Sequence, residues 1–253
     1  MFVCITGSGT RTLRETLAGR RLRLARTAVK GSDGFLTVQI AGRRFPAQEL
    51  LRVVRRCGCA LLCSREMAVP DVLRPYLFVP QTFPRIMTLR TLIRLLREAR
   101  IDPARLRIGV DDPNGAAAKL VPELLPYCAE LRVSTQCMQT YDALALRAFC
   151  TSGACVVVRD GADALHTCNL TISGSGIFFA GETWRCADVR LPQAYAGLCP
   201  AGIEADLFAA ALFERSHVYA LSACTAQSIC TPAERKKLSE AAVALRIFFE
   251  KNY

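Results

Sequence analysis

Short blocks of apolar residues alternate with clusters of Gly, Pro, Arg and Asp along the whole chain. In the first hundred residues, this pattern predicts strands at 1–6, 22–29, 35–41 and 59–63 and helices at 12–17 and 49–56. The composition of residues 30–34 predicts a hairpin loop between the second and third of these strands. Prolines between residues 69 and 84 predict an ordered connector without long regular structure. We therefore expect this part of the chain to be mixed α/β.

After the connector, Thr88 is placed to cap a helix whose apolar residues recur at helical spacing: Leu89, Leu92, Ile93 and Leu96. From residue 106, strand and helix patterns alternate, with strands expected at 106–110, 130–134, 155–158 and 169–172 and helices at 116–128 and 139–149. Such alternation predicts right-handed crossovers and a parallel sheet. Pro122 and Pro126 should kink or split the first of these two helices.

Two more helices are expected near the C-terminus. One spans 204–214, and the other opens at the sequence Thr231-Pro232-Ala233-Glu234, which has the form of a capping box. At 253 residues the chain is long enough for two domains, which we place at 1–100 and 101–253. The longest apolar run is far shorter than the roughly 20 residues that span a bilayer, and the first residues lack the layout of a secretory signal. We expect a cytoplasmic protein that does not enter a membrane.

Polar and glycine-rich loops follow the predicted parallel strands. Ligands bind beyond the carboxyl ends of such strands, where loops and helix N-termini present N–H groups. The candidate ligand-binding residues from these loops are Asp112, Asn114, Gly115, Ser134, Ser173, Gly174, Ser175 and Gly176. Alternatively, Asp112 or Asn114 only turns the chain and caps a helix, and residues 173–176 form a plain turn.

By the order of its elements, the segment 106–178 resembles the Rossmann-like superfamily of NAD(P)-binding domains. The expected fold class is therefore α/β, a Rossmann-like parallel sheet with a smaller mixed α/β N-terminal lobe. The resemblance implies NAD(P) as a cofactor. However, the phosphate turn of that family is G-x-G-x-x-G, and the matching residues 110–118 keep only Gly115 and small alanines. Asp111 and Asp112 also place negative charge where a pyrophosphate would lie.

Positive charge is concentrated in the first part of the chain. Residues 1–107 hold 21 Lys and Arg against 7 Asp and Glu, whereas the whole chain has a net charge of +11. Clusters at Arg20-Arg21-Leu22-Arg23, at Arg43-Arg44 and at Arg52, Arg55 and Arg56 would suit the phosphates of a nucleic acid. The alternatives are a solvated basic face and an Arg bias of the genome.

Cysteine and histidine give no sign of metal or acid–base chemistry. Several of the thirteen cysteines lie inside apolar blocks, which is typical of reduced, packed thiols. Cys57, Cys59 and Cys63 lack the paired spacing of a zinc site, so we expect no metal. The two histidines, His166 and His217, lie in no catalytic motif, and no catalytic residue is identified.

Three functions remain open from these patterns. The first is binding of a nucleotide or small anionic metabolite between the two lobes, with or without catalysis. The second is binding of nucleic acid or another polyanion through the Arg-rich N-terminal lobe. The third is a regulatory or interaction role on a scaffold whose ligand site has degenerated.

Overall fold

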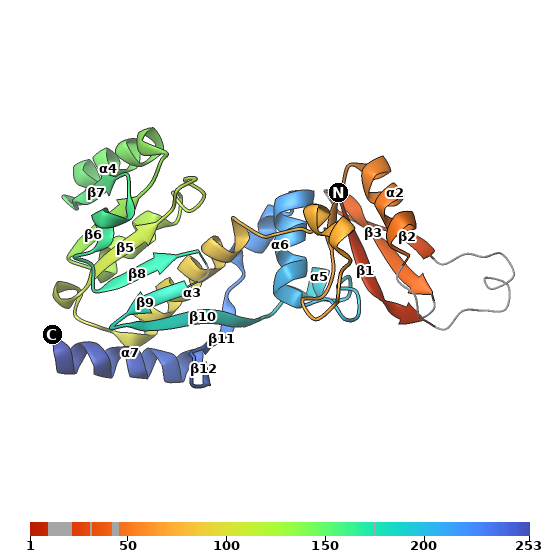
Figure 1. The fold of residues 1–253 in the computed structure, drawn as a ribbon. Helices are drawn as coiled ribbons and strands as arrows, with labels where there is room; N and C mark the ends of the chain where they lie inside the picture. The colour runs from red at the N-terminus through yellow and green to blue at the C-terminus, as the bar shows by residue number, and fades with distance from the viewer. Residues whose placement is uncertain (10–21, 31, 42–45, 175) are drawn as a thin grey trace, which may run out of the picture. The chain divides into compact units, whose positions relative to one another are not determined.

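A computed structural model describes residues 1–9, 22–30, 32–41, 46–174 and 176–253, which form two compact units (Figure 1). The first unit contains residues 1–80 and 191–221, and the second contains residues 81–190 and 222–253. The fold class is mixed α/β, with one mixed sheet in each unit. The two units interleave along the chain, whereas the sequence pattern places a single boundary at residue 100.

The sheet of the first unit has the order β2-β3-β1-β4. Strand β1 (Phe2–Gly9) is parallel to β3 (Ser32–Ala41) and to β4 (Ala60–Leu62), and β2 (Leu22–Val29) pairs with β3 as the predicted antiparallel hairpin. Helix α2 (Ala47–Cys57) buries Leu50, Leu51 and Val54 and ends at Gly58 in the left-handed conformation. The helix predicted at 12–17 lies outside the described residues.

A distant segment completes the core of the first unit. This segment, residues 191–221, contains α5 (Gln193–Ala196) and α6 (Ala205–Ser216). Earlier in the chain, the connector predicted at 69–84 contains the 3-10 turn η1 (Asp71–Tyr76). Phe208 of α6 packs edge-on against Phe2 and Phe35, with ring centroids 6.1 and 5.2 Å away. The three rings are buried. Such aromatic contacts contribute about 0.5–1.5 kcal/mol each beyond their burial, so they hold residues 205–216 against the sheet.

The sheet of the second unit has the order β12-β11-β10-β9-β8-β5-β6-β7 among the described residues. Its parallel part contains β5 (Arg107–Asp111), β6 (Glu130–Ser134), β7 (Val156–Arg159) and β8 (Leu170–Ser173), which confirms the four predicted strands. Strand β5 lies between β6 and β8. The antiparallel part contains β9 (Gly176–Phe179), β10 (Glu182–Val189), β11 (Ala226–Cys230) and β12 (Arg235–Lys237), none of which the sequence pattern predicted.

The helices of the second unit correct several expectations. Helix α3 (Phe83–Ala99) begins five residues before Thr88, with Pro84 in its first turn, and α4 (Met138–Ser152) lies close to its predicted position. The helix expected at 116–128 is absent: residues 116–120 form turns and η3 (Val121–Tyr127) is a 3-10 segment. Pro122 and Pro126 explain this, because proline removes an amide donor and blocks the preceding turn of an α-helix.

The C-terminal helix α7 (Leu238–Asn252) begins later than predicted. The Thr231 hydroxyl accepts from the amides of Ala233 and Glu234, so it caps a turn that leads into β12 rather than a helix. Helix α3 packs against α7 and against β8 to β11, and it buries all four of its predicted apolar residues. The described helices include none with the length and apolar character needed to cross a bilayer.

Candidate ligand site

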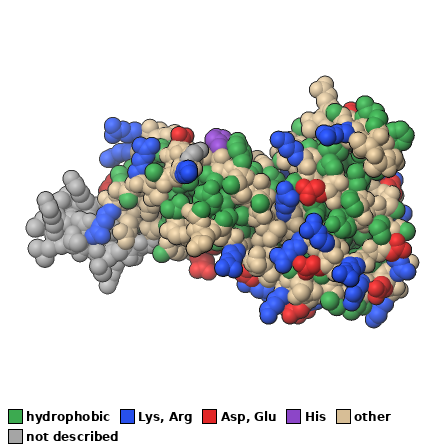
Figure 2. All heavy atoms as spheres, turned by 180° about the vertical axis from the view of Figure 1, so that it is seen from behind, with side chains coloured by type: hydrophobic (Ala, Val, Ile, Leu, Met, Phe, Trp, Pro, Cys, Tyr) green, Lys and Arg blue, Asp and Glu red, His purple; other side chains and the backbone are tan. Residues whose placement is uncertain are grey.

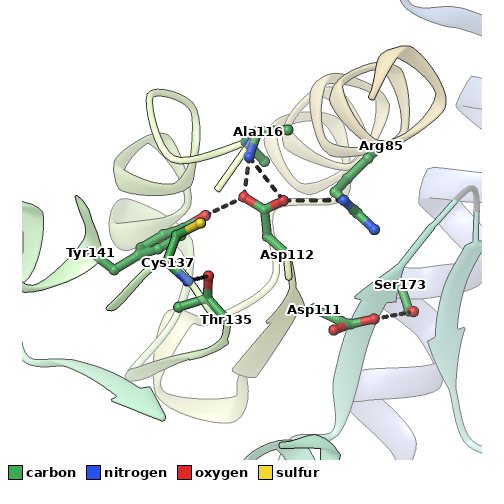
Figure 3. Close-up of polar contacts among 9 residues, drawn as sticks. Arg85, Asp111, Asp112, Ala116, Thr135, Cys137, Tyr141 and Ser173 are labelled. Carbon is green, nitrogen blue, oxygen red and sulfur yellow. Dashed lines mark hydrogen bonds and ion pairs between the residues drawn. The ribbon is translucent and has the colours of Figure 1, made fainter. Parts of the chain in front are cut away.

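Three strands of the second unit end together at the residues that the sequence singled out. In the sheet register, Asp111 at the end of β5 pairs with Ser134 of β6 on one side and with Ser173 of β8 on the other. The Ser173 hydroxyl donates to Asp111 Oδ2 over 2.6 Å (Figure 3). The structure therefore brings Ser134 and Ser173 to the two sides of the β5 carboxyl end.

Asp112 is completely buried and accepts hydrogen bonds at both oxygens (Figure 3). Its Oδ1 accepts from the Ala116 amide at 3.1 Å and from Arg85 Nη1 at 3.2 Å. Its Oδ2 accepts from the Ala117 amide at 2.8 Å and from the Tyr141 hydroxyl at 2.7 Å. Because a carboxylate offers about four lone-pair sites, these donors saturate it. Asp112 thus shapes the loop and orients Arg85.

Arg85 lies on the first turn of α3 and reaches the carboxyl end of β5. The residue is 9% exposed, so its guanidinium is largely removed from water. Only Nη1 forms a hydrogen bond with the described residues, and Nε is buried without a partner. A guanidinium has five N–H donors, and buried donors left unpaired destabilise a protein by about 1–3 kcal/mol each. The group therefore has unused capacity for an anion.

The loop after β5 turns at Gly115, which has φ +68°. A Cβ at this position would lie 3.2 Å from the Cβ of Cys137, at the N-terminus of α4, so glycine also permits the close packing of the loop on α4. Asn114 is exposed on the same loop. In the loop after β8, Gly174 has φ +57° with open space beside it, and Gly176 begins β9. Ser175 lies outside the described residues.

Arg85 and Tyr141 are the site residues that the sequence pattern did not identify. Both come from helices, and each is far along the chain from Asp112. For Arg85 a signal exists in retrospect, since it stands alone among apolar neighbours in the run Phe83-Pro84-Arg85-Ile86-Met87. A charged residue inside such a run is rarely buried unless it is paired.

Tyr141 has a perturbed acidity that can be measured. Burial raises the pKa of its hydroxyl, and the hydrogen bond to the Asp112 carboxylate raises it further. Below about pH 10 the tyrosine is protonated in both the folded and the unfolded chain. At higher pH the unfolded chain ionises first, so the folded protein loses up to about 1.4 kcal/mol of stability per pH unit through this group.

Replacement of Tyr141 with phenylalanine should therefore have an effect that depends on pH. At pH 7 the variant loses the hydrogen bond to Asp112, which should lower the free energy of unfolding by about 1–2 kcal/mol. Above pH 10 this deficit should shrink, because only the wild type is destabilised by tyrosine ionisation. Urea unfolding of both proteins at pH 7 and pH 11 measures the difference. Buried thiols with raised pKa, such as Cys128, are present in both proteins and cancel. If Tyr141→Phe lowers the free energy of unfolding by the same amount at pH 7 and at pH 11, the pKa of Tyr141 is not raised in the folded protein.

The other candidate groups do not converge on a site. All thirteen cysteines are free, and burial raises the pKa of Cys59 and Cys63. Among the described residues, no group of three or more His, Cys, Asp or Glu side chains is placed to hold a metal ion.

The described residues include only some members of the three arginine clusters. Arg52, Arg55 and Arg56 are exposed on α2, and Arg55 Nε donates to the Tyr76 hydroxyl at 3.0 Å. Arg20, Arg21, Arg43 and Arg44 lie outside the described residues. On the face drawn in Figure 2, the visible Lys and Arg side chains of the described chain are interspersed with acidic and apolar ones. Nucleic-acid binding stays a prediction.

Comparisons of the chain with protein-family models, with curated proteins and with solved structures found no match.

Proposed function

We propose that the second unit binds a small anion that also carries hydroxyl groups, such as a nucleotide or a sugar phosphate, at the carboxyl ends of β5 and β8. The observation that carries this proposal is Arg85, a buried guanidinium that uses one nitrogen for Asp112 and has no other hydrogen bond to the described residues. A phosphate or carboxylate that accepts from the remaining nitrogens would satisfy it with charge-assisted bonds.

The strand order supports the same position. The chain runs from β5 outward to β6 and β7, then returns to β8 on the other side of β5. This is the order of half a Rossmann-like doubly wound sheet, and ligands of such sheets lie in the crevice where the strand order reverses. By that rule, we place the proposed ligand between the carboxyl ends of β5 and β8, beside Asp111 and Ser173. We therefore propose a Rossmann-like origin for the parallel part of this sheet.

We propose that Asp111 binds the hydroxyl groups of the ligand, as Arg85 binds its anionic group. Its Oδ2 accepts from Ser173, and its side chain is half-buried at the edge of the sheet. In this proposal, the other carboxylate oxygen of Asp111 accepts from a hydroxyl or amine of the ligand. A pure anion would be repelled by Asp111, whereas an anion with neighbouring hydroxyls would satisfy both Arg85 and Asp111.

A pyrophosphate held as in NAD(P)-binding domains does not fit this loop. In those domains the amides at the start of the helix after the first strand bind the pyrophosphate. Here the amides of Ala116 and Ala117 already donate to the Asp112 carboxylate, which occupies that position. Asp112 therefore acts as an internal anion, and any ligand must use Arg85 instead. We propose binding without assigning a catalytic step.

Thermal denaturation in the presence of candidate ligands tests the proposal. ATP, NADPH and S-adenosylmethionine at millimolar concentration are suitable probes, because a ligand at 100 times its Kd stabilises the folded state by about 2.7 kcal/mol. For a chain of this length, that corresponds to a rise in Tm of roughly 5–10 °C. Pyrophosphate, an anion without alcohol hydroxyls, should stabilise the protein less than ATP does. The best ligand is then titrated by calorimetry into wild type and into Arg85→Lys.

Arg85→Lys keeps the positive charge beside Asp112 but loses the fork of donors, so affinity should fall by at least about tenfold. Arg90→Lys is the matched control: Arg90 lies on the same helix, its Nε is also buried without a partner, and its Nη1 pairs with Glu123 over 3.3 Å rather than with Asp112. It should bind like the wild type. Flat thermal curves with ATP, NADPH and S-adenosylmethionine, or equal affinity of Arg85→Lys and wild type, would overturn the proposal.

A further inference from the structure

A hollow lies within the second unit, beside α4. It has a volume of about 950 Å³ and runs between the outer flank of α4 and residues 118–126. The wall formed by α4 contains mainly small and apolar residues, including Ala143, Leu144 and Ala148. The opposite wall includes Pro122, Leu125 and Pro126. None of the candidate residues at the ends of β5 and β8 lines this hollow, so it is a distinct feature.

The hollow exists because the crossover from β5 to β6 does not form a regular helix. A helix in that crossover would normally pack beside α4 on the sheet. Instead, the prolines restrict residues 121–127 to a 3-10 segment, and the flank of α4 stays uncovered. Helix α4 accordingly buries only Tyr141 and Ala148, although α3 in the same unit buries twelve residues.

The charged residues at the hollow all have one sign. Lys119 and Arg147 line it, and no Asp or Glu does. Both are exposed, and within the described ranges neither forms an ion pair or a side-chain hydrogen bond. The two cations therefore flank an apolar surface without any compensating carboxylate, which is the electrostatic complement of a molecule with an apolar body and an anionic group.

We propose that this hollow binds an amphipathic carboxylate, with its apolar body along α4 and its carboxylate between Lys119 and Arg147. The volume lies within the 300–1,000 Å³ that is typical of small-molecule sites. The α4 wall extends from Thr140 to Ser152, a length of about 18 Å at 1.5 Å per residue, which suits an extended chain. The exposed apolar residues Leu146 and Phe149 of α4 do not line the hollow, so the surface is not one continuous protein-docking face.

Fluorescence titration with 11-(dansylamino)undecanoate, at concentrations below those at which it aggregates, tests this proposal. The uncharged amide of the same probe is titrated in parallel. The wild-type chain should bind the carboxylate saturably. In the double variant Lys119→Ala/Arg147→Ala, affinity for the carboxylate should fall at least about tenfold, whereas affinity for the amide should change less than about threefold.

Two further variants make the test specific. Lys251→Ala/Arg185→Ala removes an exposed lysine and an exposed arginine elsewhere in the second unit and should leave both affinities unchanged. Ala143→Trp fills the hollow from an exposed position of α4 and should abolish binding of both probes. The proposal is overturned if binding is not saturable, if the cation variant weakens both probes equally, or if Ala143→Trp binds like the wild type.

Discussion

Replacement of Asp112 with alanine is expected to lower the free energy of unfolding of the second unit by about 3–5 kcal/mol. The carboxylate is fully buried, balances the charge of Arg85 and accepts from the amides of Ala116 and Ala117. Without it, a buried guanidinium and two loop amides lose their acceptor at the same time. Chemical denaturation followed by tryptophan fluorescence reports on this unit, because Trp184 is the only tryptophan of the chain and is buried in β10.

The neighbouring residue provides the control for this prediction. Asp111→Ala removes a half-buried carboxylate with a single hydrogen bond from Ser173, so it should cost about 1 kcal/mol. The double variant Asp112→Ala/Arg85→Met should be more stable than the sum of its single changes by about 1–3 kcal/mol, since no uncompensated charge stays buried. Equal losses from Asp111→Ala and Asp112→Ala would show that Asp112 is not the residue that holds the loop.

The parallel strands and the hairpin could be predicted because their local pattern and their final environment agree. Residues 130–134 and 22–29 are short blocks with β-branched or alternating apolar character, bounded by turn residues, and they form β6 and β2 with those limits. One strand of the antiparallel part gave no such signal. Strand β12 is Arg235-Lys236-Lys237, which pairs at the edge of the sheet without contributing an apolar residue. Its strand conformation depends on its pairing with β11, which no local pattern encodes.

The prediction of a helix at 116–128 was wrong, because hydrogen bonds to Asp112 and two prolines outweigh the helix propensity of the alanines. Alanines at 116–118 favour a helix, but Asp112 holds the amides of Ala116 and Ala117 in a turn, and the two prolines prevent a helix from continuing. The sequence showed the prolines clearly. It could not show that the carboxylate of Asp112 would fold inward rather than toward a ligand.

The candidate site was predictable only as far as the sheet determines it. The rule that parallel strands end at one edge places Ser134 and Ser173 beside Asp111, and the register agrees. Arg85 and Tyr141 come from helices, and their approach to Asp112 depends on how α3 and α4 pack on the sheet. Helix periodicity identifies which face is apolar but not which strand end the first turn will reach. The charge that best supports ligand binding was therefore the one that the pattern did not reveal.

Replacement of Gly34 with alanine is expected to lower the free energy of unfolding of the first unit by about 3 kcal/mol or more. Gly34 has φ +69°, next to an irregularity of the β2–β3 register between Thr27 and Val29. A Cβ at this position would lie 2.2 Å from the carbonyl oxygen of Thr27, which is far inside van der Waals contact. The obstacle is backbone, so no side chain can rotate away and the hairpin itself must shift.

Gly58→Ala is the control, because it introduces alanine at a positive φ without a steric clash. The difference between the two variants therefore measures the clash with the Thr27 carbonyl. Gly58 ends α2 with φ +60°, and a Cβ there meets nothing within 4 Å, so its replacement should cost only about 1 kcal/mol. Chemical denaturation of the full chain, followed by far-UV circular dichroism, compares the two variants. Hydrogen exchange of peptides spanning β2 and β3 should accelerate in Gly34→Ala alone. Similar losses in both variants would mean that the bulge relaxes freely, and the Thr27 carbonyl would not be what requires glycine at position 34.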